Sequence, residues 1–527
     1  ETSATLYVPV TLATLEHTAA LHYALETAIT KEFVQQLKTA PALKVVKELS
    51  VRLTAVAKDM VDVQLPIIPV SVIMATSGTL QASNVNSSVK GSQVQLLRSK
   101  SAELQPALRD GDCRNGQCSC WPGFKGSTCE DATPTNFPNE NLGINLGGLA
   151  YWSTQYIHRN YFYQSSAWIP QYYPGYYNST LAYTWNTSEN IAMRSDGYPT
   201  SLNASQKVAK LVLRDLKLKY PKSDTNRYLL LFEGEGLIDI GFDATILNYR
   251  PGRILFKVVP TTVRDNGVYV QLLKTNPSNP IHNIRIILES DEYLVQEVIT
   301  DSFREFIKQF STIRLMDLSS TNGNPNINWS DNVSPVQDTQ AGEKGVCPDL
   351  LVDLLKRTGR NGWINIPHLA TDDYVTQYAT LLFNKLSPHQ LIYVEYAINV
   401  EFFFEQGKYA IAQATALGLS NPHVFYGTRC LQIFTIFSTV FGANRTTSQL
   451  RFVVSGQAVN VWVMRQAMSV PGLATMANII AIAPYFDCSN IGNSTNSAYY
   501  SIGSVDDIIS RCDSTLSTMD SAITPYQ

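Results

Sequence analysis

Charged side chains are scarce in this sequence. They make up 16% of its 527 residues, against about a quarter in an average globular protein. The 41 Lys and Arg are offset by 44 Asp and Glu, so the net charge is −3. Because no basic field is present to attract a polynucleotide, we expect no nucleic-acid partner. Low charge combined with many hydroxyl and amide side chains favours a secreted or wall-associated protein.

Hydrophobic runs long enough to cross a membrane are also missing. The two most apolar stretches, residues 430–442 and 471–486, are shorter than the roughly 20 residues of a transmembrane helix and are interrupted by polar residues or Pro. We therefore expect no transmembrane segment. The chain begins with Glu1 rather than Met, which is compatible with removal of a signal peptide and equally with a trimmed sequence.

Motifs of several enzyme classes do not occur either. The sequence contains no H-E-x-x-H, Walker or G-x-S-x-G pattern. This argues against a zinc protease, a P-loop nucleotidase and a serine hydrolase of the α/β type. We expect neither a metal nor an organic cofactor.

The chain is too long for one ordinary hydrophobic core, and its patterns divide it into four segments. Residues 1–110 combine strand-like runs with an amphipathic helix and predict a small α+β sandwich domain. Residues 111–130 are rich in Cys, and residues 131–142 read as a linker of Pro and Asn. Residues 143–527 form the main domain.

Two patterns follow one another in this main domain. Short strands separated by turns between about residues 205 and 290 predict an inserted β-sandwich. Helices and strands then alternate, which predicts a parallel sheet or barrel. The expected fold class is therefore α/β plus β.

Four of the eight cysteines fall within CRNGQCSCWPGFKGSTCE. The C-x-C, the Gly123-Phe124 pair and the closing Cys resemble the second half of an epidermal-growth-factor-like module of the tenascin kind, without its first two cysteines. A zinc knuckle is the alternative, but no His lies nearby and the spacing does not suit paired CxxC ligands. So small a unit needs cross-links, which predicts an oxidising compartment. The resemblance implies the disulfides Cys113–Cys118 and Cys120–Cys129.

The other four cysteines allow three pairings. Of these we favour Cys347–Cys430 together with Cys488–Cys512.

Sequons for N-glycosylation support the same extracellular location, because several lie in polar, loop-like stretches. Pro335 follows one of them, that of Asn332, and makes its use less favourable. The candidate sites are Asn86, Asn178, Asn186, Asn203, Asn328, Asn332, Asn444 and Asn493.

Several strand-like stretches resemble a single family. They are GINLGGLAYWST, RLMDLSSTN, WINIPHLATDDYV, YVEYAINVEF, the RFVVSGQ–NVWV segment and AIAPYF, spread over residues 143–486. Together they resemble secreted glycoside-hydrolase-like barrels, a family that includes the tubular flagellar-hair (mastigoneme) proteins of stramenopile algae and the sexually induced secreted proteins of diatoms. An EGF-like module ahead of such a barrel is similar to the algal members. The resemblance implies a (β/α)8-type barrel.

The catalytic positions of that family are altered here. In its enzyme-like members the fourth strand ends Y-V-E-Y-S-N-E-V-W-N, and the second Glu is assigned as the acid/base. Glu395 matches the first Glu, but Asn399 stands at the position of the second, and Glu401 replaces the family's Trp. An amide cannot donate a proton to a leaving oxygen near neutral pH. We therefore interpret all three as degenerate catalytic positions.

The family's second carboxylate lies in a Y-E-G-G motif on the strand after AIAPYF, and no such motif follows here. Retaining and inverting hydrolysis both need two placed carboxyl groups. The resemblance thus implies a pseudoenzyme rather than an enzyme. The other polar groups at strand ends, which we interpret as helix caps, loop acceptors or structural residues of the barrel mouth, are Asp317, Asp372, Asp373, Asp487 and His368.

The pattern provides six of a barrel's eight strands, beginning near Ile144, Ile313, Trp363, Ile392, Phe452 and Ile479. The first and last would then lack neighbours, and an open edge binds other strands. We expect copies of the chain to assemble head to tail, with the N-terminal TLYVPVTL or the sheet edge of one subunit docking on the next. This predicts an extracellular glycoprotein filament, such as a flagellar hair.

Two other functions stay open. Residues 151–200 are rich in Tyr and Trp, and such clusters either bind sugars by stacking or pack a loop-rich surface. A carbohydrate-binding pseudoenzyme is therefore one alternative. An active glycoside hydrolase that uses Glu395 or Glu401 is the other.

Overall fold

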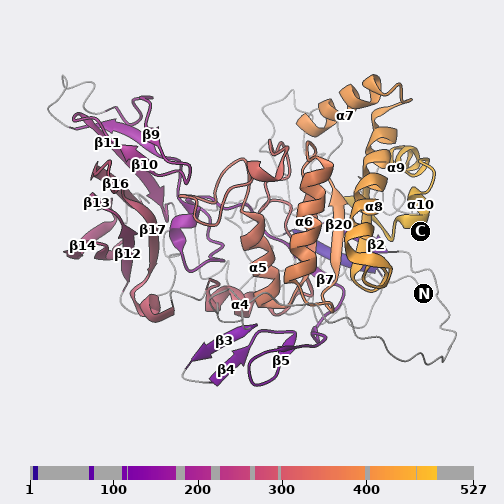
Figure 1. Cartoon of the computed structure of the whole chain (residues 1–527), viewed down its shortest axis with the longest axis horizontal. Coiled ribbons are helices and arrows are strands. Elements are labelled where there is room, and N and C mark those ends of the chain that lie inside the picture. Colours follow the sequence, from indigo (N-terminus) through magenta and orange to yellow (C-terminus); the bar gives the residue numbers. More distant parts are fainter. Residues whose placement is uncertain are drawn as a thin grey trace, which may run out of the picture.

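The fold is mixed α/β and consists of a barrel sheet wrapped by helices, two antiparallel sheets to one side of it and a small Cys-rich module below (Figure 1). The computed structural model describes residues 4–9, 71–75, 110–114, 117–173, 184–214, 226–260, 267–294, 298–397, 404–458 and 460–483. For residues 4–9, 71–75, 113–114 and 117 it describes the backbone alone.

Six parallel strands form the first part of the barrel sheet, which confirms the parallel sheet expected from the sequence. Alternate side chains of a strand point to opposite faces, and both faces are buried here, so these strands are apolar or hydrogen-bonded throughout. The internal strand β19 is buried at every position. In spatial order the strands are β7 (Leu142–Asn145), β18 (Thr312–Arg314), β19 (Asn361–Ile366), β20 (Ile392–Tyr396), β21 (Leu450–Gln457) and β22 (Ile479–Ala483).

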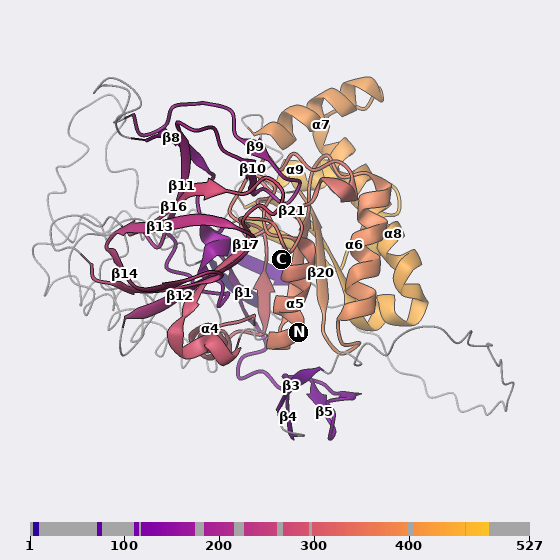
Figure 2. The same ribbon diagram turned by 60° about the vertical axis from the view of Figure 1, so that its left-hand side comes forward.

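Helices cover the outer face of this sheet (Figure 2). Local signals fix where several begin and end: Thr371 caps the first turn of α6 with its side chain, and Gly359 ends α5 with a φ of 64°. Outward-facing strand residues such as Ile364 and Val394 share one hydrophobic core with them. The helices are α4 (Asp301–Ile307), α5 (Pro348–Thr358), α6 (Asp372–Lys385), α7 (Glu405–Ala416), α8 (Pro422–Gln449), α9 (Val461–Met468) and α10 (Leu473–Met476).

The longest of these helices, α8, is the one described helix that is long and apolar enough to be a candidate membrane span, with 44% of its most apolar window buried in the fold. Its aromatic residues Phe434, Phe437 and Phe441 belong to the barrel's outer core, and it packs against α6, α9, β20 and β21. Packing against the barrel is by itself a sufficient reason for α8 to be apolar. The absence of a transmembrane segment stays a prediction.

The sequence led us to expect that the two outer edges of the six-stranded sheet are open. This expectation is wrong, because both edges are paired. Strand β1 (Ala4–Pro9) pairs in parallel with β7, and β2 (Ser71–Ala75) pairs antiparallel with β22. Strands β1 and β2 also pair with each other, so the ring of strands closes. The two described pieces of residues 1–110 therefore lie in the barrel sheet rather than in a sheet of their own.

Two four-stranded antiparallel sheets lie between β7 and β18 in the chain and pack face to face around a second hydrophobic core. We call this pair the sandwich. It begins with β8, earlier than the limit of about residue 205 expected from the sequence. One sheet has the order β13 (Gly236–Phe242), β16 (Val268–Thr275), β11 (Gln206–Val212) and β8 (Ile169–Tyr172). The other has the order β14 (Ala244–Arg250), β15 (Arg253–Val258), β12 (Arg227–Glu233) and β17 (His282–Leu288).

A buried ion pair joins the sandwich to the long loop that follows β18. Lys210 of β11 is fully buried, and its Nζ lies 2.6 Å from Oδ2 of Asp338. The ammonium also donates to the Ser166 carbonyl at 2.7 Å and lies 5.0 Å from the ring centre of Trp168. Burial lowers the pKa of Lys210 and raises that of Asp338, while their attraction opposes both shifts. Each charge makes the burial of the other tolerable, so the loop and the sheet are held together as one unit.

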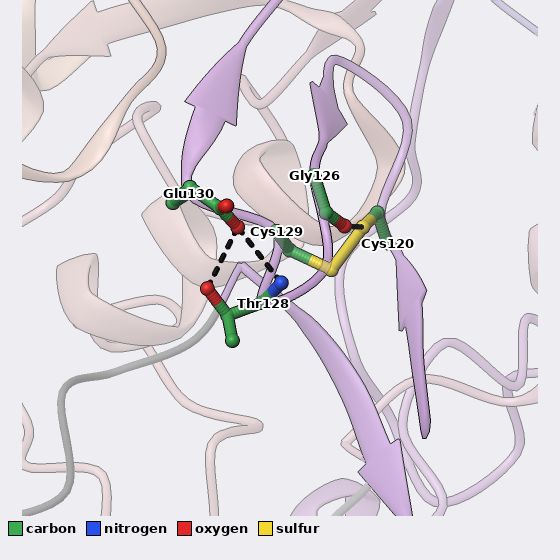
Figure 3. The surroundings of a disulfide bond; sticks show 5 residues. All are labelled: Cys120, Gly126, Thr128, Cys129 and Glu130. Atoms are coloured by element: carbon green, nitrogen blue, oxygen red, sulfur yellow. Dashed lines mark hydrogen bonds between the residues drawn. A yellow bond between two sulfur atoms is a disulfide. The ribbon is translucent and has the colours of Figure 1, made fainter. Parts of the chain in front are cut away.

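The Cys-rich module is a pair of small hairpins, β3 (Gly111–Arg114) with β4 (Gln117–Cys120) and β5 (Phe124–Lys125) with β6 (Asp131–Ala132). The disulfide Cys120–Cys129 joins them, as expected (Figure 3). Cys118 is also disulfide-bonded, and the backbone pairs it directly with Cys113.

This module is anchored to the barrel. Its Trp121 is buried beneath Arg357 of α5, whose guanidinium carbon lies 4.3 Å from the ring centre. The neighbouring Lys356 forms an ion pair with Asp110. The module is therefore fixed to the barrel through α5.

The expected disulfide Cys347–Cys430 is wrong: both thiols are free and buried. Cys347 precedes the first turn of α5, whereas Cys430 lies within α8, and α6 packs against both of these helices. Burial raises the pKa of the Cys347 thiol to about 11. The expected partners Cys488 and Cys512 lie outside the described residues.

Candidate functional site

The carboxyl ends of the parallel strands meet at one end of the barrel, which is where barrel enzymes carry their catalytic groups. Glu395 of β20 points into the barrel there, since its neighbours Val394 and Tyr396 face the outer helical core. In register beside it lie Asn365 of β19 and Val453 of β21. The strand alternation thus turns the Glu395 side chain into the barrel near the carboxyl ends of its strands.

Five side-chain contacts from donor groups surround the carboxylate of Glu395, which is 1% exposed. Oε2 accepts from Trp363 Nε1 at 2.6 Å and from Asn365 Nδ2 at 2.6 Å. The same oxygen accepts from the guanidinium of Arg314 at 2.8 and 3.3 Å. The hydroxyl of Ser455 donates to Oε1. Every contact is the donor type that an ionised carboxylate can accept.

Arg314 is the countercharge in this network and is itself held in place. Its guanidinium carbon lies 5.4 Å from the ring centre of Trp363. That ring stacks on Tyr393 with centres 5.3 Å apart and planes 10° from parallel. The surroundings are apolar, with Val453 and Ile479 in the same cluster. We refer to Glu395, Arg314, Trp363, Asn365 and Ser455 as the barrel clasp.

A second carboxyl group, Asp317, follows β18 at the same end of the barrel. Asn145 Nδ2 donates to its Oδ2 at 2.7 Å. Burial raises the pKa of Asp317, and the Asn145 hydrogen bond and the charge of Arg314 only partly offset this. A raised pKa at a barrel mouth is a property of general acids, so Asp317 is the described group with the chemistry nearest to catalysis.

His368 lies just after β19, and its ring contacts Tyr409 of α7 edge-on at 5.6 Å. Burial lowers its pKa, against the opposing charge of Glu405. Its carbonyl accepts from the Tyr396 hydroxyl at 3.0 Å. These contacts fit the structural part that the sequence assigned to it.

The remaining sequence candidates are separated from this site or lie outside the described residues. Asp372 is the first residue of α6, as expected, and its exposed carboxylate pairs with the buried Arg429. Asp373 accepts from Gln377 within the same helix. Asn399, Glu401 and Asp487 lie outside the described residues.

Most of the barrel clasp escaped the sequence interpretation. Arg314, Asn365 and Ser455 are polar residues of β18, β19 and β21, each at a position of the inward-facing alternation. A search for polar residues at matching alternate positions of successive strands would have found them. Among the described residues no group of three or more possible metal ligands occurs.

Comparison of the chain with protein-family models, with curated proteins and with solved structures finds no match. The resemblance to glycoside-hydrolase-like barrels therefore rests on the motifs quoted above. Function has to be argued from the arrangement of the side chains.

Five of the eight predicted glycosylation sites lie in the described part of the chain. Four of these are exposed, whereas the amide of Asn332 is fully engaged. Its Nδ2 donates to the Trp329 carbonyl at 3.0 Å, and its Oδ1 accepts from Asn326 and from the Tyr374 hydroxyl. The exposed sites are Asn186, Asn203, Asn328 and Asn444.

Glu395→Gln should destabilise the protein strongly. The new NH2 group would face N–H donors, and Arg314 would lose its countercharge in a buried site, a loss of about 3–5 kcal/mol for such pairs. Chemical denaturation followed by circular dichroism measures the change. Glu305→Gln, at a surface ion pair with Lys308, is the control and should leave the curve almost unmoved. Equal curves for both variants would contradict the structural importance of the barrel clasp.

Glycan mapping should find the exposed sequons occupied and Asn332 bare, because its Nδ2 donates to the Trp329 carbonyl and two donors to its Oδ1 hold the half-buried amide in place. The measurement is enzymatic deglycosylation in H2 18O followed by peptide mass spectrometry of the secreted protein. Asn328, in the adjoining sequon and exposed, is the internal control. Equal occupancy at Asn328 and Asn332 would show that the local fold yields to the glycan.

Proposed function

We propose that this chain is a non-catalytic structural subunit of an extracellular glycoprotein filament of the flagellar-hair kind. It is built on a degenerate glycosidase-like (β/α)8-type barrel and carries a truncated EGF-like module. The observation that carries the proposal is the barrel clasp: Glu395 is 1% exposed and occupied by donors from three other strands. Its carboxylate serves to hold strands together.

A glycosidase needs one group that gives a proton and another that attacks or activates water. Glu395 is paired with Arg314 at 2.8 Å and closed off from solvent, which suits it for neither task. The family's acid/base position is occupied by Asn399, and no Y-E-G-G motif supplies the partner. Asp317 is left as a single suitable group among the described residues at the mouth, and one carboxyl group does not complete either mechanism.

The closure of the barrel suggests how subunits join. Strands β1 and β2 complete the ring from the far end of the chain, and the edges of β7 and β22 accept them through backbone hydrogen bonds. The same edges would accept β1 and β2 of a neighbouring subunit equally well, because the sequences are identical. Donation of this pair to the next subunit in turn produces an open chain of subunits, which is a filament.

The purified full chain should release no reducing sugar from neutral β-glucans above a heat-treated control. The reason is that, among the described residues at the barrel mouth, Asp317 has no second suitable carboxyl group beside it. Asp317→Asn should leave this baseline unchanged. Turnover that is lost in Asp317→Asn would instead establish a glycosidase and overturn the proposal.

The exchange of strands can be tested with a cysteine pair. Ile73 and Ala481 lie directly opposite each other in the antiparallel pair β2–β22, at a separation that suits a disulfide. In assembled material, Ile73→Cys/Ala481→Cys should give a ladder of multimers on a non-reducing gel, because each bond links two subunits. Each single variant is the control. A cross-linked product at monomer mass, from filaments seen by negative-stain microscopy, would show that the barrel closes within one chain and that filaments form in another way.

A further inference from the structure

Three aromatic rings gather on the outer face of one sandwich sheet. Trp185 and Phe242 stack with centres 6.1 Å apart and planes 10° from parallel. Tyr269 of β16 lies beneath both, 4.7 Å from Phe242 and 5.5 Å from Trp185, with planes 21° and 29° from parallel. We call these three residues the aromatic platform. Phe242 and Tyr269 belong to β13 and β16, whose sheet lies to one side of the barrel (Figure 1), and Trp185 lies in the chain between β8 and β11.

The two upper rings of the platform are open to solvent. Trp185 and Phe242 are each 45% exposed, whereas Tyr269 is 6% exposed. Large aromatic rings are worth most to a fold when they are buried. Nearly parallel, exposed rings of this kind therefore form a flat apolar surface without a partner among the described residues.

Phe242 reaches this surface through a backbone conformation that is unfavourable for its side chain. Ile238 and Ile240 face the sandwich core, so the alternation of β13 would point residue 242 inward as well. Its φ of 63° lies in the left-handed region instead, and the ring stacks on the outer face. For a bulky residue this conformation is an outlier and carries a conformational cost. A Gly at position 242 would adopt the same backbone conformation without that cost. The presence of Phe therefore indicates that the phenyl ring itself has a function.

Polar side chains border the platform on the same face. Lys207 Nζ donates to Gln271 Oε1 at 2.9 Å, and Asp239 pairs in register with Gln271 from the next strand. Gln171 accepts from the Tyr269 hydroxyl and donates to the Trp185 carbonyl at 3.0 Å. Lys207 and Asp239 carry opposite charges, and amides lie between them and the rings.

Gly241 lies beside Tyr269 and has no side chain that could cover the platform. These two residues lie directly opposite each other in β13 and β16. A Cβ at Gly241 would approach the Tyr269 ring at 3.8 Å, an ordinary contact. A longer side chain at this position would therefore cover the platform without disturbing the sheet.

We propose that the aromatic platform binds a neutral polysaccharide through the flat faces of its pyranose rings. The C–H bonds of a pyranose face pack against aromatic rings, while its equatorial hydroxyls point sideways toward amide and charged groups such as Gln271, Lys207 and Asp239. The balanced charge of the border favours an uncharged sugar. The site lies on the sandwich and is independent of what the barrel mouth does.

Affinity gel electrophoresis of the full chain tests the site with three polymers: laminarin and hydroxyethyl cellulose, which are neutral β-glucans, and alginate, which is acidic. At least one neutral glucan should retard the protein, and alginate should not. Trp185→Ala and Phe242→Gly should each weaken binding by at least about tenfold, as expected when a central aromatic contact is removed. Gly241→Val should weaken it comparably, although it removes no ring.

Trp462→Ala is the matched control, since Trp462 is 51% exposed on the barrel helix α9 and should not affect binding. Thermal unfolding of each variant separates lost binding from lost folding. Failure of both neutral glucans to bind, or equal retardation by alginate, would overturn the proposal. So would binding that appears only in Asn186→Gln, because the platform would then be covered by the protein's own glycan. Phe242→Gly that unfolds at a much lower temperature while still binding would show that the ring has a packing role alone.

Discussion

The charge pair of Glu395 and Arg314 is the constraint on which the barrel depends. Barrel interiors are usually filled by branched apolar side chains in layers, and burying a carboxylate is tolerated only when it is fully paired. Here Arg314, Trp363, Asn365 and Ser455 come from β18, β19 and β21 and converge on one carboxylate of β20. A slip of any of these strands by one residue would turn its donor outward. We infer that the main effect of the barrel clasp is to fix the register of four strands at once. Its net contribution to the free energy of unfolding is the smaller effect.

For the pseudoenzyme that we propose, the same arrangement is a way to lose activity without losing the fold. A carboxylate that must keep its donors to hold strands in register is not available for proton transfer. Asp317 differs from Glu395 in both respects. Its raised pKa suits it to proton transfer, and its single side-chain hydrogen bond, from Asn145, means that it holds little of the structure together. Loss of an acid at the strand end removes activity and leaves the barrel clasp intact.

Local sequence patterns were sufficient to predict the elements whose residues lie close together in the chain. The six parallel strands follow from short apolar runs between helices, and the start of α6 follows from Thr371 and the acidic residues after it. The sandwich follows from alternating strands and turns, although β8 lies before the expected limit because the segment after it interrupts the pattern. The pairing of Cys347 with Cys430 was wrong because spacing along the chain does not show that α6 packs against both of their helices. Phe242 was missed because a positive φ in a bulky residue has no sequence signal.

The closure of the barrel could not be read from the sequence, and the reason bears on assembly. Strand β2 pairs with β22, so Ile73 meets Ala481 from almost the opposite end of the chain. Contacts between such distant residues form late, since the closure entropy of a long loop must be met before the pairing contributes. Until then, the edges of β7 and β22 stay open while the inner strands and helices are already packed. A neighbouring subunit at high local concentration can supply β1 and β2 during that interval. The distance along the chain thus leaves an interval for the exchange of strands between subunits that we propose.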